Sequence, residues 1–444
     1  METKSILIKM LPQTRRHFLF FLLFCFFAVA VSRAAPTSTT CPPFEGRPIA
    51  TVEFQGLNHT RSSVVKDALE NRQGGLFSCK DWETERNRLK DLDIFADVTL
   101  LAQPRQDSVS LVYRFRELPP FLPLASVSKT DQDGWSVGPA VALMNVLGTG
   151  KRLDLLTRFG GTTEYQAQIS GRQLFGHPAE FSAAWIHSDS YNPFDSAHEN
   201  SHRIKGEGFW PWMGNREFGM IGLAEYFWIR ASSAKITLRS TGDEVPRIGL
   251  GLRWDTRDRV LIPRRGFFLE TRFTQNGGEL GGPSDFWEEM TDMRAYLPFT
   301  RRQGFATSAL YQYRKGLLGS YDHFHVGGAN TLRGYTDNSY YGQNECLLNG
   351  EYRFDAVEER IQKLGSWSLN YGVQLVAGVD AASLWNGNFA MPGILHPGVY
   401  GGVHILIPGM ERIRLEVGSK TTRMDLLFTA GLFEKTTVQR FKTR

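Results

Sequence analysis

The sequence predicts a mainly β protein, in which a 16-stranded transmembrane antiparallel β-barrel at residues 120–444 follows one small N-terminal α+β domain. Three observations predict this fold. Helical periodicity ends after Pro120, and the segments beyond it alternate apolar and polar residues with period two. The strands are long, often ~10 residues, as crossing a bilayer at a tilt requires. The 325 residues of this region, at ~20 per strand and connection, give about 16 strands.

The first segment has the features of a secretory signal peptide. A basic start is followed by an uncharged apolar run of 14 residues, Phe18 to Val31, and then by a small-x-small cleavage site ending at Ala34. The run is shorter than the roughly 20 residues of a membrane-spanning helix. We therefore expect residues 1–34 to be a signal peptide and residues 35–47 a linker. Cleavage would lower the net charge from +5 to +1, so nothing argues for a nucleic-acid partner.

The cysteines fit an exported protein. Cys41 and Cys79 could form a disulfide in an oxidising compartment, which leaves Cys346 without a partner. No cysteine has the spacing of a metal site.

Residues 48–119 have the element order of a compact α+β domain. We expect a strand, two helices and two further strands, at 48–57, 61–71, 82–92, 95–103 and 108–117. Asn58-His59-Thr60 would cap the first helix. The stretch DLDIFADVTL…LVYRFRE resembles a POTRA domain. This resemblance implies a periplasmic module whose open sheet edge receives an extended polypeptide as an added strand. The alternative is a rigid spacer.

The alternating strands predict which side chains face lipid. In RIGLGLRWD, one face carries Ile248, Leu250, Leu252 and Trp254, and the other carries glycine and charged residues. In a closed barrel every second residue faces a wet lumen, which explains a mean hydropathy of −0.29 in a membrane protein. The many Phe, Tyr and Trp residues would supply the outer face and its aromatic girdles.

The stretch GGANTLRGY (327–335) is not a phosphate-binding loop. It lacks a Lys-Ser/Thr pair after its last glycine, and no helix follows it. His323 and His325 could share a face, but no third metal ligand is evident. Because no nucleophile–base pair stands out either, we expect neither an enzyme nor a cofactor or metal site.

Three motifs occur in a fixed order along the predicted barrel. They are NVLGTGK (145–151), WDTRD (254–258) with Pro263 and Gly266, and Gly327-Gly328 followed by Leu332-Arg333-Gly334-Tyr335. With these motifs the chain resembles the BamA/TamA superfamily of outer-membrane assembly factors, over nearly all of the mature chain.

The resemblance implies a lumenal latch. In that family the sixth extracellular loop folds back into the lumen, and its arginine is held by acidic residues of the barrel wall. The latch loop here would comprise Gly327, Gly328, Leu332, Arg333, Gly334 and Tyr335. Strand alternation turns Glu351 and Asp380 inward, so we expect Arg333 within salt-bridge distance of one of them.

A second charged motif comprises Asp255, Arg257, Asp258, Pro263 and Gly266. We expect Arg257 to pair with Asp258 in the lumen; the alternative is a solvated turn before Pro263.

The function implied by the resemblance is insertion or folding of barrel proteins in the outer membrane of a Gram-negative-type cell. The first and last strands, expected near 135–145 and 424–433, would meet at a seam that templates an incoming strand. The last strand would end at Phe433 or Phe441. Partners would be unfolded outer-membrane or exported polypeptides and outer-membrane lipid, with no nucleotide. Only one POTRA-like unit is visible, which leaves accessory subunits open. A polypeptide secretion pore and a passive surface antigen are the alternatives.

Overall fold

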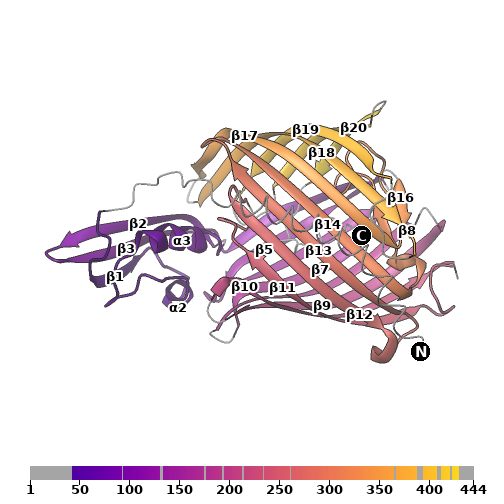
Figure 1. Cartoon of the computed structure of the whole chain (residues 1–444), viewed down its shortest axis with the longest axis horizontal. Helices are drawn as coiled ribbons and strands as arrows, with labels where there is room; N and C mark the ends of the chain where they lie inside the picture. The colour runs from indigo at the N-terminus through magenta and orange to yellow at the C-terminus, as the bar shows by residue number, and fades with distance from the viewer. Residues whose placement is uncertain are drawn as a thin grey trace, which may run out of the picture.

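The computed structural model describes residues 43–429 apart from short gaps, at 93, 131–133, 175–176, 193–194, 213–214, 234, 261, 365–366, 388–393, 408–411 and 421–422. A small α+β domain lies at one end of a large barrel of tilted strands (Figure 1). The predicted signal peptide, Cys41 and the two candidate ends of the last strand, Phe433 and Phe441, lie outside the described residues.

The N-terminal domain has the predicted element order: β1 (Ile49–Gln55), α2 (Ser62–Lys66), α3 (Cys79–Lys90), β2 (Phe95–Arg105) and β3 (Ser108–Glu117). The sheet order is β1-β3-β2, with β1 parallel and β2 antiparallel to β3. Both helices pack on this sheet, and Val65, Leu89 and Leu111 are fully buried between them. This burial of apolar area, at roughly 25 cal/mol per Å², is the main stabilising contribution.

The two helices begin differently. Ser78 caps α3 by accepting a hydrogen bond from the Asp81 backbone N–H, and basic residues lie in the last turn. The predicted cap of α2 is wrong: its N-cap is Arg61, with no side-chain bond, and the helix is shorter than expected. The Thr60 N–H instead donates to the carboxylate of Glu117, the last residue of β3. Cys79 is disulfide-bonded, and Cys346 is a free, buried cysteine.

The barrel is one antiparallel sheet of sixteen strands among the described residues. The strands are β4 (Phe121–Thr130), β5 (Gly134–Val146), β6 (Lys151–Gly160), β7 (Thr163–Leu174), β8 (His177–Asn192), β9 (Ala197–Trp212), β10 (Asn215–Ala231), β11 (Asp243–Asp255), β12 (Gly266–Gly277), β13 (Asp285–Pro298), β14 (Gln303–Leu317), β17 (Asn344–Leu364), β18 (Trp367–Trp385), β19 (His396–Leu406), β20 (Ile413–Lys420) and β21 (Arg423–Thr429). Short 3-10 helices, η1 (Gly278–Leu280) and η2 (Ser320–Asp322), lie in two of the connections.

The first strand of the barrel is β4, so its expected position near 135–145 is wrong; that stretch is the second strand, β5. β4 contains Pro123, a residue that is uncommon inside strands. Proline is tolerated in a strand at the end of a sheet, where one row of N–H groups has no ladder to join.

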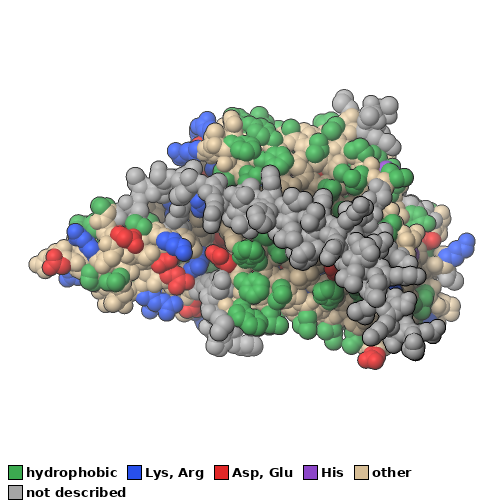
Figure 2. Space-filling view, viewed as in Figure 1, with side chains coloured by type: hydrophobic (Ala, Val, Ile, Leu, Met, Phe, Trp, Pro, Cys, Tyr) green, Lys and Arg blue, Asp and Glu red, His purple; other side chains and the backbone are tan. Residues whose placement is uncertain are grey.

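The two faces of the barrel wall divide as the alternation predicts. Ile248, Leu250, Leu252 and Trp254 are 41–62% exposed on the outer face, whereas Glu270 is buried inside. Hydrophobic side chains gather over the visible wall of the barrel, and charged side chains gather on the N-terminal domain (Figure 2). Within the part of the chain that the structure describes, no helix is long and apolar enough to span a membrane.

The stretch that contains Arg333 lies in the long connection between β14 and β17. Two short strands, β15 (Phe324–Val326) and β16 (Tyr340–Gly342), pair with each other at the base of this loop. The loop between them returns into the barrel, where Leu332 is fully buried among Met290, Leu310 and Leu347.

Candidate functional site

Arg333 lies inside the barrel and contacts both residues that the alternation turned inward. Its Nε and Nη2 donate to the two carboxylate oxygens of Asp380 at 2.7 Å each, and its backbone N–H donates to the same carboxylate at 3.1 Å. Its Nη1 lies 3.9 Å from Glu351. Arg333 is 8% exposed, so these charges meet away from bulk water, where pairing is strong and an unpaired charge is costly.

Two further partners of Arg333 were not predicted. Glu416 of β20 accepts from Nη1 at 2.9 Å, and the ring of Tyr400 in β19 lies 3.1 Å from the guanidinium carbon. Glu416 alternates with the apolar residues Leu415 and Val417 in β20, but strand periodicity does not say which loop reaches its face of the wall. We define the latch as Arg333 with Asp380, Glu351, Glu416 and Tyr400.

Glycines shape the latch loop. Gly327, Gly328 and Gly334 have φ values of +136°, +81° and +89°, a region that L side chains rarely adopt. A Cβ on Gly334 would lie 2.4 Å from the backbone carbon of Ser419 in β20. The Tyr335 hydroxyl donates to the Pro397 carbonyl at 2.9 Å. The RGY sequence therefore combines one long charged side chain with a backbone that fits directly against the barrel wall.

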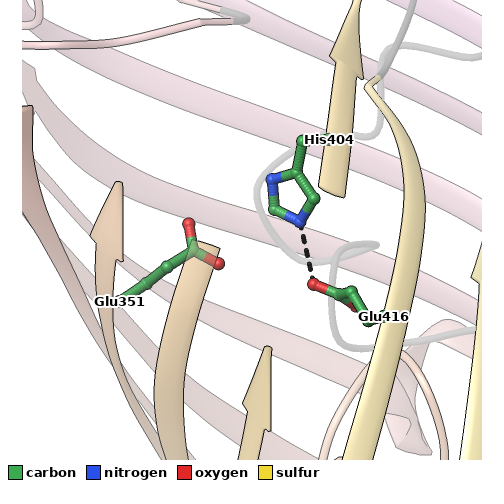
Figure 3. A group of neighbouring side chains, drawn as sticks. All are labelled: Glu351, His404 and Glu416. Atoms are coloured by element: carbon green, nitrogen blue, oxygen red, sulfur yellow. Dashed lines mark hydrogen bonds and ion pairs between the residues drawn. The ribbon is translucent and has the colours of Figure 1, made fainter. Parts of the chain in front are cut away.

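Glu351, His404 and Glu416 point toward one another in the lumen (Figure 3), and their ligand atoms all lie within 4.8 Å. His404 Nε2 lies 2.8 Å from a Glu416 oxygen. Four arginines also pair with these two carboxylates, namely Arg333, Arg353, Arg412 and Arg414. Because the carboxylate charge is already compensated by guanidinium groups, this cluster fits an ion-pair network better than a cation site.

The latch borders a cavity of about 240 Å³ that extends toward the N-terminal domain, where Asp91 and Leu92 contribute to its wall. Each arginine of its lining lies within 3.7 Å of a carboxylate oxygen: Arg152, Arg172, Arg253, Arg257, Arg294, Arg333, Arg353, Arg412 and Arg414. The lumen is thus a balanced network of ion pairs rather than a basic surface for phosphate groups.

The second charged motif is arranged differently from the prediction. The side chain of Arg257 is buried and pairs with Asp255, its Nη2 and Nε lying 2.6 and 2.8 Å from the carboxylate. The expected Arg257–Asp258 pair is wrong. Asp258 instead accepts the backbone N–H groups of Arg264 and Arg265, at 2.9 and 3.1 Å, and so closes the turn before β12.

The last two residues of this motif also serve the turn. The Pro263 carbonyl accepts from Arg353 at 3.4 Å. Gly266 has φ +109°, and a Cβ there would lie 2.3 Å from the Thr256 carbonyl oxygen. The motif therefore combines a lumenal ion pair with a tight turn. The two interpretations of the sequence, a lumenal pair and a turn before Pro263, each described part of this arrangement.

The NVLGTGK turn joins the barrel to the N-terminal domain. Asn145 Nδ2 donates to Thr60 Oγ1 at 2.7 Å, and the Arg61 N–H donates to the Gly148 carbonyl at 3.0 Å. Thr60 in turn donates its N–H to Glu117 at 2.8 Å. A Cβ on Gly148 would lie 2.2 Å from the His59 carbonyl oxygen. We define the junction as His59, Thr60, Arg61, Glu117, Asn145 and Gly148; no sequence pattern linked its two halves.

A family comparison agrees with this barrel and its inward-folded loop. The Omp85 superfamily domain matches residues 157–425, which is more than half of the sequence. The chain belongs to the Omp85 superfamily. This membership agrees with the family resemblance drawn from the three motifs and implies an outer-membrane protein.

Relatives of this Omp85 chain include an outer membrane protein assembly factor, BamA, from Nitratidesulfovibrio vulgaris. The two are 22% identical over 301 residues, which cover 64% of this chain and 37% of that relative. The chain therefore spans well under half the length of this relative.

Three solved structures have a similar fold, each 14% identical over 87% of this chain. For CdiB from Escherichia coli the TM-score is 0.60, and the match covers 75% of that chain. For CdiB from Acinetobacter baumannii the TM-score is 0.54, and the match covers 73% of that chain. For BamA from Haemophilus ducreyi lacking POTRA domains 1–3 the TM-score is 0.50, and the match covers 84% of that chain. At this level of identity the likeness concerns the fold.

Proposed function

We propose that this chain inserts or folds other barrel proteins in the outer membrane. The observation that carries the proposal is the position of β4 and β21. They are the two ends of the sheet and lie side by side, and among the described residues no hydrogen-bonded ladder joins them. An unpaired strand edge in lipid is costly, so an opened seam here would favour pairing with the strand of an incoming polypeptide.

The N-terminal domain, in this proposal a POTRA-like module in the periplasm, would receive the client first. The start of β1 is covered, because the Ile49 N–H donates to Gly75 and the Phe77 N–H donates to Arg47. Among the described residues β2 pairs only with β3, so its outer edge has no strand partner there. An extended segment of an unfolded polypeptide could add along this edge through main-chain hydrogen bonds.

The latch would hold the wall on one side of the seam. Arg333 connects its own loop to β17, β18 and β20, and β20 pairs directly with β21. We infer that the latch keeps these strands in register while β21 exchanges partners. Neither a nucleotide nor a catalytic group is needed, because folding into the bilayer is favourable once the strand edges are paired.

Depletion in living cells tests the proposal. When the chain is depleted, we expect other outer-membrane barrels to decline in the outer-membrane fraction, and wild-type protein to restore them. Normal accumulation of those barrels would sink the proposal. If instead the barrels persist and one exported polypeptide fails to reach the surface, the chain is a secretion pore. A passive surface antigen predicts neither change.

A further inference from the structure

A groove of about 420 Å³ lies on the outer wall of the barrel, across β8, β9 and β10. It is lined by Trp185, Asn200, His202, Ile204, Trp228, Ile229 and Arg230. Trp185 and Ile204 are directly opposite in the ladder and are 42% and 52% exposed, although both are large and apolar. The groove is distinct from the lumen and from the seam, which β4 and β21 form.

The outward residues of β9, the middle strand of the groove, indicate how deep the groove lies in the membrane. From Ile204 to Trp212 the outward positions of β9 carry only isoleucine, glycine and tryptophan, a span that matches the ~9–11 residues of a tilted membrane strand. Asn200 and His202 continue this outward face at the end of the strand farther from the N-terminal domain. Tyr165, His187, His202 and Trp228 form a row of ladder neighbours at this boundary, where aromatic rings meet the headgroups.

Arg230 is the cation of the groove. It is exposed, and the structure gives it no hydrogen bond or ion pair with any described residue. Its stem packs on Gly242, whose added Cβ would lie 2.8 Å from Arg230 Cγ. The neighbouring carboxylates have other partners. Glu244 accepts from the Tyr226 hydroxyl at 2.9 Å, and Asp189 accepts from Asn200 at 3.4 Å.

We propose that this groove binds one phosphate-bearing lipid of the leaflet farther from the N-terminal domain. The acyl chain would lie along Ile204 between the indoles of Trp185 and Trp228, and the phosphate would sit at Arg230. Lipid is the occupant because this face of the wall meets the membrane, and because the lining changes from apolar to cationic along one strand. A guanidinium at the headgroup level forms charge-assisted hydrogen bonds with a phosphate.

The test counts the lipids that stay on the folded protein. The full-length mature chain is placed in phosphatidylcholine nanodiscs with a minor fraction of phosphatidylglycerol, released into mild detergent and analysed by native mass spectrometry. We expect wild type to retain phosphatidylglycerol in preference to phosphatidylcholine. Arg230→Gln should lower this retention about fivefold, the effect of one cation near an anionic headgroup.

Matched variants separate the groove from general lipid adhesion. Arg301→Gln removes an exposed arginine at the opposite end of the barrel, and Trp212→Ala removes an exposed tryptophan there. Both should retain lipid like wild type, whereas Trp228→Ala should not. Heat-modifiable gel mobility verifies that each variant is a folded barrel. Equal retention by Arg230→Gln and wild type, or equal loss in Arg230→Gln and Arg301→Gln, would overturn the proposal.

Discussion

The latch and the junction hold the same barrel by different chemistry. The latch is ionic: one guanidinium meets three carboxylates, and all of these side chains are at least nine-tenths buried. At the junction the hydrogen bonds from Asn145 to Thr60 and from Arg61 to Gly148 are neutral, and Gly148 lies against the His59 backbone. Buried charges cost several kcal/mol to unpair, whereas a neutral hydrogen bond contributes about 1 kcal/mol. The barrel interior is therefore held strongly, and the N-terminal domain is held more weakly.

The largest expected effect comes from removing the latch arginine. Arg333→Ala leaves Asp380 as a buried charge without its ion-pair partner and removes one of the partners of Glu416, so we expect the free energy of unfolding to fall by about 3–5 kcal/mol. Urea unfolding in detergent micelles, followed by heat-modifiable gel mobility, measures this change. The control is Arg301→Ala, whose ion pair with Glu358 is exposed to solvent and should contribute little to stability. Equal stability of the two variants would mean that the latch contributes nothing to holding the wall.

A smaller effect should separate the domains without unfolding the barrel. Gly148→Ala places a methyl group against the His59 carbonyl at a φ of +71°, which we expect to weaken docking by about 1–3 kcal/mol. Limited proteolysis of the link between Glu117 and Phe121 should then be faster.

Gly134→Ala is the matched control for this variant. Gly134 has a similar φ of +76°, but nothing lies within 4 Å of an added Cβ. If both variants are cleaved at the same rate, backbone strain rather than the contact with the N-terminal domain explains the result.

The smallest effect is a pH dependence confined to the junction. Burial alone would raise the pKa of Glu117, but hydrogen bonds from Thr60 and His59 outweigh it and lower the pKa below its ordinary 4.5. The ionised carboxylate therefore stabilises the junction above the ordinary pKa. This contribution declines as the pH falls below 4.5 and is lost once the pH passes the lowered value.

Cleavage of the link by an acid-active protease, followed from pH 6 downward, measures this dependence. We expect exposure of the link to rise at acid pH while the barrel keeps its gel mobility. Glu117→Gln should remove the pH dependence, and an identical profile in that variant would assign the effect to another group.

The sequence predicted well whatever depends on strand periodicity. The alternation alone turned Glu351 and Asp380 inward, and both contact Arg333. It could not select Glu416, because the choice of partner depends on where a long loop returns. The junction escaped prediction for the same reason: Thr60 and Asn145 are 85 residues apart and share no period. The local charge pattern failed at Asp258, whose carboxylate accepts backbone N–H groups of the turn instead of pairing with Arg257.

The latch and the junction also determine which strands would bear a mechanical load on the molecule. The junction grips the turn between β5 and β6, and β5 pairs with β4. The latch grips β20, which pairs with β21. Each terminal strand therefore lies one strand away from an anchored block. A pull on the N-terminal domain would reach β4 through the link after Glu117 and β5 through the junction, so it would load the boundary between β4 and β21, where no hydrogen-bonded ladder joins the described strands.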